Sequence, residues 1–338
     1  MSLQITWFVL IMVLFAGFFL LEGFDFGVGM LLPFLGRNNV ERSTILSSVG
    51  PFWDANEVWL ITAGGAMLAA FPNWYATLFS GFYLVFILLL LSLIVRGAAF
   101  EFRGKHNSPR WRRTWDWLAF VGSTLPGFLW GIVVANMLLG VPIDAHMHYV
   151  GTPWQLFNPK AIIAGLAFTL MFALHGAVFL SLKTEHKLME RSFKAALLLW
   201  LPTVILAAIF IGGLYMASPI VHNFGSDLRV LTPIVGGLAL LLIPVMVLLR
   251  RSGMAFILTS VTVLLTTLTV AMAIFPNVLI SSLNPAWNLN IINASSSPYT
   301  LTVMSWIALT CVPFVLAYQA WNYWVFRKRV SVHTLSHH

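Results

Sequence analysis

The sequence predicts an all-α integral-membrane protein, a polytopic bundle of nine transmembrane helices with the N-terminus outside and the C-terminus in the cytoplasm. Of the 338 residues, 59% are hydrophobic and only 9% are charged, and the mean hydropathy is +0.87. Such a chain has too few polar side chains to cover a water-exposed surface. Its apolar stretches are long enough to cross a bilayer, which takes about 20 residues.

The nine expected spans follow one another through short connectors. The first is longer than a bilayer needs, and Gly23 and Gly27 near its end match the GxxxG pattern of closely packed membrane helices. The second begins after Pro51, the fourth is entered through the basic run RWRRTWDW, and the last ends at Phe326, directly before Arg327. The predicted spans are residues 5–32, 53–70, 77–96, 117–139, 161–182, 195–217, 231–249, 253–275 and 301–326.

No connector is long enough to hold a folded extramembrane domain. We therefore expect residues 1–338 to form a single integral-membrane domain. The longest outer connectors, residues 140–160 and 276–300, are expected to form lids or short surface helices.

The orientation follows from the basic residues. Of the 19 Lys and Arg residues, 17 fall at the odd-numbered connectors and the C-terminal tail, and 2 fall at the even-numbered connectors. Because cytoplasmic loops carry the excess of Lys and Arg, this split predicts that the odd connectors and the tail are cytoplasmic. The net charge of +8 thus reflects topology. The basic cluster at residues 103–113 is expected to meet anionic membrane lipid, and no nucleic-acid partner is expected.

Four of the 11 carboxylates lie in or beside apolar spans, as two pairs spaced three residues apart. Glu22 and Asp25 belong to LEGFDFG, and Asp54 and Glu57 belong to FWDANEVW. Residues three apart share one helix face, so each pair presents its carboxyls together. An acid at membrane depth costs about 2.5 to 3.5 kcal/mol on insertion scales, and such acids usually serve ions, protons or a polar partner.

The predicted topology brings the two pairs to a similar depth. Glu22 lies about 25 Å along the first span, at 1.5 Å per residue, and the second span starts on the same side. The four carboxyls are therefore expected to converge near the inner face, with Asn56 and Thr62 as polar neighbours. Two structural alternatives remain open, because Asp54 can cap its helix and Glu22 can pair with a buried base such as Arg96.

Little else in the sequence points to a catalytic or cofactor site. His175 is the one histidine well inside a span, and Met171 precedes it by one turn on the same helix, so the two cannot ligate one haem iron from opposite faces. We expect His175 to be a hydrogen-bonded interior histidine. A single cysteine, Cys311, excludes an internal disulfide or a cysteine-ligated cluster. We expect no catalytic, cofactor-binding or metal-binding residue in this chain alone.

Long runs of the sequence resemble subunit II of cytochrome bd-type quinol oxidases. These runs are LEGFDFGVGMLLPFLGR, GPFWDANEVWLITAGGAMLAAFP, RWRRTWDW, AMAIFPN and SSPYTLTVMSWIALTCVPFVLAYQAWNYW. They occur in the family's order and cover the chain nearly end to end. The resemblance implies a bacterial or archaeal plasma-membrane protein of the respiratory chain, one half of a heterodimer that oxidises quinol and reduces oxygen to water.

The resemblance also implies cofactors, partners and site residues. The b-type and d-type haems and the quinol-oxidising loop are expected in the partner, subunit I, and a small third subunit is compatible with the family. Membrane lipid and quinone are the other expected partners. Subunit II is expected to support assembly and to lead protons from the cytoplasm. Asp25 and Asp54 carry over as proton-transfer residues, with Glu57 and Glu22 as less constant members of the set.

Two other classes of function remain open from the residues themselves. A secondary transporter or cation antiporter subunit also uses acids within membrane spans. A purely structural scaffold would instead hold the acids in ion pairs. Co-purification with a haem-rich, coloured partner distinguishes the oxidase from the transporter.

Overall fold

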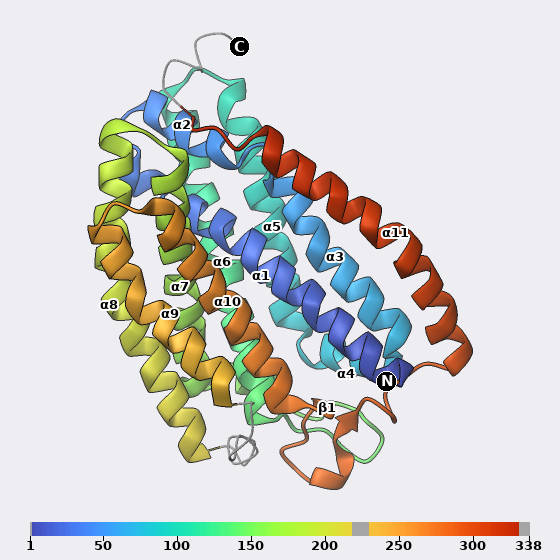
Figure 1. Cartoon of the computed structure of the whole chain (residues 1–338). Helices are drawn as coiled ribbons and strands as arrows, with labels where there is room; N and C mark the ends of the chain where they lie inside the picture. The colour runs from blue at the N-terminus through green and yellow to red at the C-terminus, as the bar shows by residue number, and fades with distance from the viewer. Residues whose placement is uncertain (1, 218–229, 331–338) are drawn as a thin grey trace.

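The structure, a computed structural model, describes residues 2–217 and 230–330 and is built almost entirely of helices (Figure 1). Two short strands, β1 (Asn277–Leu279) and β2 (Leu289–Asn290), form an antiparallel pair. The α-helices within the described residues are α1 (Leu3–Leu35), α2 (Asn39–Val49), α3 (Trp53–Ala70), α4 (Pro72–Gly81), α5 (Tyr83–Phe102), α6 (Pro109–Leu139), α7 (Pro159–Lys183), α8 (His186–Ala217), α9 (Leu231–Leu248), α10 (Ser252–Ile274) and α11 (Pro298–Val325).

Eight of the described helices are long and apolar enough to cross a membrane, which confirms the predicted class of fold. They are α1, α5, α6, α7, α8, α9, α10 and α11. The remaining predicted span coincides with α3, which has 18 residues but carries Asp54, Asn56 and Glu57 in its first two turns. The count of nine spans and the orientation of the termini stay predictions.

One predicted span is wrong, and one helix was not predicted. The third span does not run from residue 77 to residue 96, because the helix is interrupted at Phe82, between α4 and α5. The first connector, for which the sequence analysis made no prediction of secondary structure, contains α2, capped at its N-terminus by the side chain of Asn38. Both differences arise where hydropathy carries no signal, since residues on both sides of Phe82 are apolar and α2 is polar.

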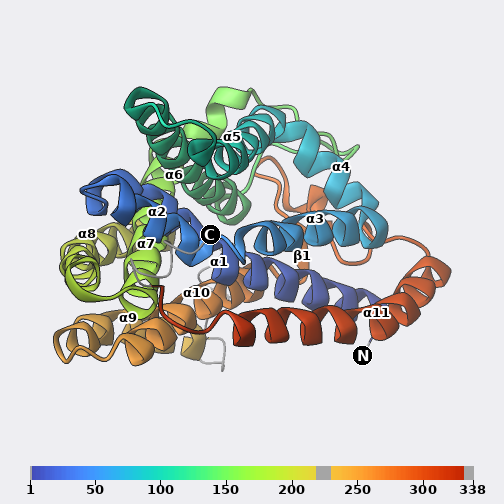
Figure 2. The same ribbon diagram turned by 90° about the horizontal axis from the view of Figure 1, so that it is seen from above.

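Helix α1 lies at the centre of the bundle and contacts α3, α6, α7 and α10 (Figures 1 and 2). It lies close to α7, where a Cβ added at Gly27 would be 2.0 Å from the carbonyl oxygen of Phe172. A Cβ at Gly176 would likewise lie 2.5 Å from the Cα of Gly27. The two backbones therefore touch, as the GxxxG pattern predicted, and this contact fixes the turn of α1 that carries Glu22 and Asp25.

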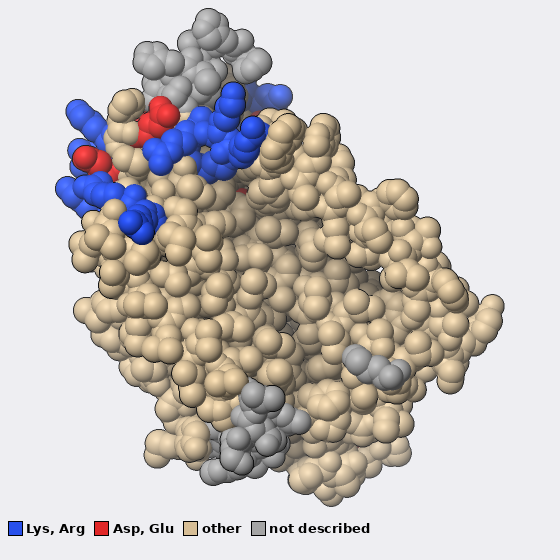
Figure 3. Space-filling model, in the orientation of Figure 1, with Lys and Arg blue, Asp and Glu red and all other residues tan. Residues whose placement is uncertain are grey.

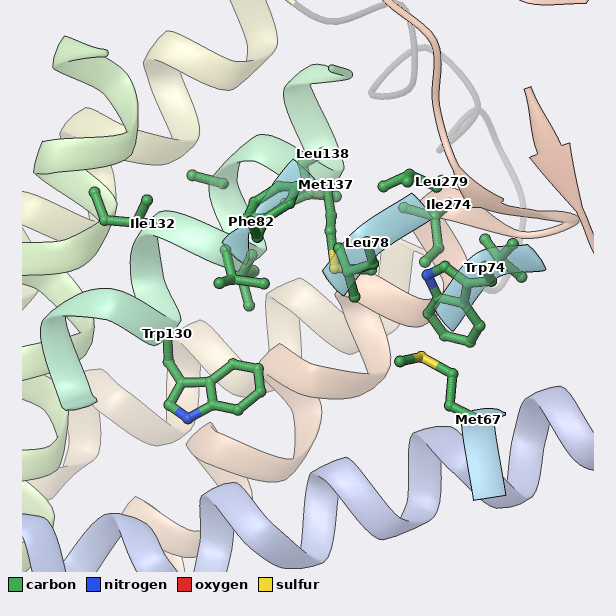
Figure 4. Close-up of a cluster of buried hydrophobic side chains, with 14 of the residues drawn as sticks. Met67, Trp74, Leu78, Phe82, Trp130, Ile132, Met137, Leu138, Ile274 and Leu279 are labelled. Atoms are coloured by element: carbon green, nitrogen blue, oxygen red, sulfur yellow. The ribbon is translucent and has the colours of Figure 1, made fainter. Parts of the chain in front are cut away.

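An aromatic and aliphatic core fills the half of the bundle near α4. Trp74 and Trp130 are buried there together with Met67 and Phe82 (Figure 4). At the same end, the two longest connectors bind one another, because Val141 donates its N–H to the carbonyl of Ile280 at 2.9 Å. Each of these connectors contains one short 3-10 helix, Pro153–Phe157 and Pro285–Trp287, as expected for surface segments.

Charged side chains gather at the opposite end of the molecule, beside α2 and the segment that follows α11 (Figure 3). We call this end the basic end and define it by residues 37–42, 103–113, 183–194, 250–251 and 327–329. The visible side of the bundle between the basic end and the connectors is almost free of charge (Figure 3). This distribution agrees with the positive-inside pattern in the sequence.

Candidate functional site

The buried acids of α1 form the centre of the candidate site. Glu22 and Asp25 are both fully buried, and their three-residue spacing places them on one face of the helix. Asn56, on the neighbouring helix α3, is also fully buried and donates from Nδ2 to Asp25 Oδ2 at 2.7 Å. The other carboxyl oxygen of Asp25, Oδ1, is buried and has no hydrogen-bond partner among the described residues.

A single cation from α5 lies among these acids. Arg96 is fully buried and forms ion pairs with Glu22 and with Glu57, where its Nη2 lies 3.1 Å from Glu57 Oε1. Its guanidinium also lies over the rings of Phe26 and Phe100, at 4.9 and 5.4 Å from their centroids. The alternative that Glu22 pairs with Arg96 is therefore confirmed, and Arg96 also pairs with Glu57, which the sequence did not suggest.

The site thus holds more acids than cations. Glu22, Asp25 and Glu57 act electrostatically on one another, and Arg96 acts on all three. One guanidinium cannot neutralise three carboxylates in a medium of low dielectric, where an unpaired charge is very costly. A cluster of this composition therefore has the chemical capacity to hold and release protons.

Asp54 occupies a different environment from the other three acids. It is exposed in the first turn of α3 and makes no hydrogen bond or ion pair within the described residues, although it lies close enough to Glu57 to act on it electrostatically. The helix cap is Phe52, without a side-chain hydrogen bond, so the alternative that Asp54 caps α3 is wrong. The expected neighbour Thr62 is exposed and bonds to the carbonyl of Val58, so it does not belong to the site.

Asp54 and Glu57 reach a large apolar cavity. Its volume is about 1430 Å³, and it extends between α3 and α5 on one side and α9 and α10 on the other. Among the described residues on its wall, Asp54 and Glu57 are the only charged ones. The four predicted acids therefore form a series from an exposed carboxyl, through a partly buried one, to two that are fully buried.

Helix α11 contributes polar groups that the sequence analysis did not single out. Gln319 Nε2 and Tyr323 Oη donate to Asn56 Oδ1 at 3.1 and 3.0 Å. Asn322 Nδ2 donates to the carbonyl of Pro51 at 3.0 Å. The available signal was the presence of two amides, three residues apart, inside an otherwise apolar span.

His175 is fully buried between α1 and α10. Its Nδ1 lies 2.7 Å from Thr259 Oγ1, and its Nε2 donates to the carbonyl of Leu20 at 3.1 Å. The ring stacks on Phe256, with centroids 4.9 Å apart. Both ring nitrogens are engaged, which confirms the prediction of a hydrogen-bonded interior histidine and leaves no nitrogen for a haem iron.

A third buried acid, Asp116, lies at the basic end and was not predicted. Arg103 Nε donates to its Oδ1 at 2.5 Å, and Arg42 Nη1 donates to its Oδ2 at 2.6 Å. Arg103 is further bonded to Ser43 and Asn39 of α2. This cluster joins α2 to the start of α6, and we call it the Asp116 latch.

Helix α2 is also joined to α8 by an ion pair. Arg191 Nη2 lies 2.5 Å from Glu41 Oε1, and the N–H of Arg37 donates to Glu41 Oε2 at 2.8 Å. Partial burial acts to raise the pKa of Glu41, but these hydrogen bonds outweigh it and hold the pKa below its usual range.

No group of three or more His, Cys, Asp or Glu side chains suited to a metal ion occurs in residues 2–217 and 230–330. Cys311 is exposed on α11. Four of the nine histidines in the sequence, His222, His333, His337 and His338, lie outside the described residues.

Comparisons with known proteins agree on one family. The model of the family described as cytochrome bd terminal oxidase subunit II matches residues 3–326. The chain is 42% identical over 330 residues to cytochrome bd ubiquinol oxidase subunit 2 of Bacillus subtilis (strain 168), covering 98% of this chain and 97% of that protein. It is 37% identical over 366 residues to cytochrome bd-I ubiquinol oxidase subunit 2 of Escherichia coli (strain K12), covering 97% and 95%.

The fold also has a counterpart among solved structures. A chain of the bd oxidase from Geobacillus thermodenitrificans aligns with a TM-score of 0.79, covering 97% of this chain and 100% of that chain at 16% identity. This likeness shows a shared arrangement of helices. The family match over nearly the whole length, together with the identities of the two relatives, shows that the chain belongs to the cytochrome bd terminal oxidase subunit II family.

Proposed function

We propose that this chain, as subunit II of a cytochrome bd quinol oxidase, provides a proton route from the cytoplasm and supports assembly of the haem-bearing subunit I. The observation that carries the proposal is the excess of buried acid, since Glu22, Asp25 and Glu57 share only one cation, Arg96. A structural ion-pair site would be expected to balance its charges. A proton-carrying site needs groups that can be ionised and neutral in turn.

The order of the acids suggests the direction of proton movement. Asp54, exposed on the cavity wall, receives the proton; Glu57 lies next to it, and Asp25 is the buried acceptor with one unbonded oxygen. Reducing one O2 to two waters consumes four electrons and four protons. If these protons enter from the cytoplasm while quinol releases its protons outside, charge is separated across the membrane without a pump.

The redox chemistry belongs to the partner in this proposal. The b-type and d-type haems of subunit I supply electron transfer and oxygen reduction, and quinol is the substrate of the complex. The chain's own residues carry protons and bind subunit I. The surface of this chain that is expected to contact subunit I includes the exposed apolar side chains of α11, such as Trp306 and Phe314. Membrane lipid, quinone and a small third subunit complete the proposed set of partners.

We also propose that the chain forms one integral-membrane domain of nine spans, with α3 as the least apolar span and the basic end in the cytoplasm. The clustering of Lys and Arg at that end supports this orientation (Figure 3). Reporters fused after Arg329 and within residues 140–160 should lie on opposite sides of the membrane. Reporters found on the same side would contradict the topology.

The other two functions are less well supported. A transporter or antiporter subunit is not favoured, because the family match covers residues 3–326. The scaffold alternative has one observation in its favour, the pairing of Glu22 and Glu57 with Arg96. It does not explain why Asp25, which has no ion pair, is fully buried beside them.

The proposal is tested in the purified complex with Asp25→Asn and Asp25→Glu. The asparagine keeps the size and much of the hydrogen bonding but removes the titratable proton, so quinol-driven oxygen consumption per haem should fall at least about tenfold. The glutamate should restore part of the rate. Asp144→Asn is the matched control, because Asp144 lies in the connector after α6 and binds two backbone N–H groups through Oδ1, which asparagine retains.

Normal haem spectra in all three variants would show that assembly is intact. Wild-type turnover in a fully assembled Asp25→Asn complex would contradict the proton-route assignment. Loss of the haem spectrum in that variant would instead support the scaffold alternative.

A further inference from the structure

Helix α11 has an unusual distribution of side chains for a helix of a membrane protein. Its outward face carries large exposed apolar groups, including Trp306, Phe314 and Trp321. Its buried residues are only Leu301 at the start and Gln319 and Asn322 near the end. A helix that exposes its apolar side chains to the membrane or a partner and buries two amides must satisfy those amides inside the protein.

Gln319 is satisfied by Asn56, and through Asn56 it reaches Asp25. The side-chain oxygen of Asn56 accepts from Gln319 Nε2 at 3.1 Å and from Tyr323 Oη at 3.0 Å. Its NH2 group donates to Asp25 Oδ2 at 2.7 Å and to the carbonyl of Leu21 at 3.4 Å. An asparagine side chain has two donor hydrogens and two acceptor lone pairs, so all four are used.

This set of partners determines which way the amide of Asn56 points. The carbonyl of Leu21 and an ionised Asp25 carboxylate are both hydrogen-bond acceptors and cannot donate. Both therefore favour the orientation in which the NH2 group of Asn56 faces them. If the amide were reversed, its oxygen would face these two acceptors. The donors on α11 stabilise the observed orientation from the other side.

We propose that Asn56, Gln319 and Tyr323 are positioning residues for Asp25. Gln319 and Tyr323 on α11 donate to the amide oxygen of Asn56 and so direct its NH2 group to Oδ2 of Asp25. Oδ1 of Asp25 is then left as the proton-carrying oxygen. The inference rests on the proposed proton route. We call this group the Asn56 clamp. It links α11 to the chemistry on α1 through hydrogen bonds alone, since Gln319, Asn56 and Tyr323 are uncharged donors and acceptors.

The clamp also predicts how the pH profile of turnover depends on α11. The charged and titratable groups that act on Asp25 are Glu22 on α1, Glu57 on α3, Arg96 on α5 and Tyr323 on α11. None of them except Tyr323 is altered by releasing the clamp. A weakened donor at Oδ2 favours the neutral carboxyl over the carboxylate, so the alkaline limb of the profile should move to higher pH.

The test uses the purified complex and the pH profile of quinol-driven oxygen consumption per haem. The double variant Gln319→Leu/Tyr323→Phe removes both donors but keeps the stacking of residue 323 on Phe52, whose ring centroid lies 4.4 Å away. Its alkaline midpoint should rise by about one pH unit, the equivalent of one hydrogen bond to a charged group. Asn322→Leu is the matched control: it removes another buried amide anchor of α11, bonded to Pro51, and should leave the midpoint unchanged.

A double-mutant cycle separates the clamp from a general loosening of α11. If Gln319 and Tyr323 act through Asn56, their substitution should have no further effect in an Asn56→Leu background. An unshifted midpoint in the double variant, an equal shift in Asn322→Leu, or additive shifts with Asn56→Leu would each overturn the proposal. If Asn56→Leu fails to assemble, the comparison between the double variant and Asn322→Leu decides alone.

Failure of the clamp can be told apart from failure of the proton route. If Asp25→Asn slows turnover but the double variant keeps the wild-type profile, only the clamp is wrong. If Asp25→Asn turns over normally, the proton route itself is wrong.

Discussion

Asp116 and Asp25 are both buried carboxyl groups, but their surroundings differ in one respect, the ratio of cations to acids. Asp116 is bound by two guanidinium groups, one on each oxygen, at 2.5 and 2.6 Å. Asp25 has a single hydrogen bond, from the neutral amide of Asn56, and shares one arginine with Glu22 and Glu57. The first site has an excess of positive charge and the second an excess of acid.

This difference separates a structural acid from one that can carry a proton. Two guanidinium groups bind Asp116, and loss of its charge would leave Arg103 buried without its partner. No such arrangement holds Asp25 in one state. Both acids are buried, so burial alone does not distinguish them; the proposed proton route rests on the balance of charge around Asp25.

The largest effect on stability is expected from Asp116→Asn. The substitution leaves Arg103, whose side chain is 5% exposed, without a compensating charge, which costs about 3 kcal/mol. The yield of assembled complex and its thermal midpoint should both fall, while turnover per assembled haem should stay at the wild-type value. A thermal midpoint equal to that of the wild type would show that the Asp116 latch is not a structural element.

A smaller effect, on rate rather than stability, is expected from Asp54→Asn. Asp54 is exposed and unpaired, so its substitution orphans no buried charge and should leave assembly intact. Water in contact with Glu57, which is 21% exposed, offers a second path for protons, so turnover should fall by about tenfold at most, or about 1.4 kcal/mol in the barrier. A loss greater than that of Asp25→Asn, measured as oxygen consumption per haem, would reverse the proposed order of the acids.

His175→Leu should have a modest effect on stability and none on haem content. The ring makes two buried hydrogen bonds, and Thr259 keeps its bond to the carbonyl of Phe256 when the ring is removed. A loss of about 1 to 2 kcal/mol is expected, visible as a lower thermal midpoint. Loss of a haem absorption band in an otherwise assembled complex would show that His175 serves a haem after all.

The smallest effect is expected from Glu41→Gln at the surface of the basic end. Because the pKa of Glu41 lies below its unfolded value, its stabilisation is fully present above the unfolded pKa and is lost as the pH falls through the folded pKa. Solvent screens this pair, so the variant should lose no more than about 1 kcal/mol at neutral pH. The difference in thermal midpoint from the wild type should vanish at acidic pH, and a difference that grows on acidification would have the wrong sign.

Hydropathy was sufficient to predict most of the helices, and its failures have physical causes. Helices α7, α9 and α10 begin and end within two residues of the predicted spans, because their limits coincide with the limits of their apolar runs. The interruption at Phe82 lies between α4 and α5 inside a continuous apolar run, so hydropathy does not mark it. Helix α2 is short and polar, so the sequence shows no hydrophobic periodicity that would predict it.

The acids of the candidate site could be predicted from the sequence, but the hydrogen bonds and ion pairs that connect them could not. Four acids in apolar segments are rare enough to stand out, and a base such as Arg96 was a natural partner for Glu22. The pairing of Arg96 with Glu57 and the bonds from α11 to Asn56 join helices far apart in the sequence. The spacing of residues along the sequence carries no information on such contacts. Asp116 was not identified as a site residue because it lies in the run RWRRTWDW, whose basic residues were interpreted as a signal of membrane topology.

The most direct test of the proton route is the rate of proton uptake from the cytoplasmic face by complexes reconstituted in vesicles, compared between Asp25→Asn and Asp116→Asn. The account predicts that uptake per assembled haem slows at least about tenfold in Asp25→Asn and is unchanged in Asp116→Asn, although the latter is the less stable complex. Wild-type uptake in Asp25→Asn, or equal slowing in both variants, would contradict the claim that the acid excess around Asp25 carries protons.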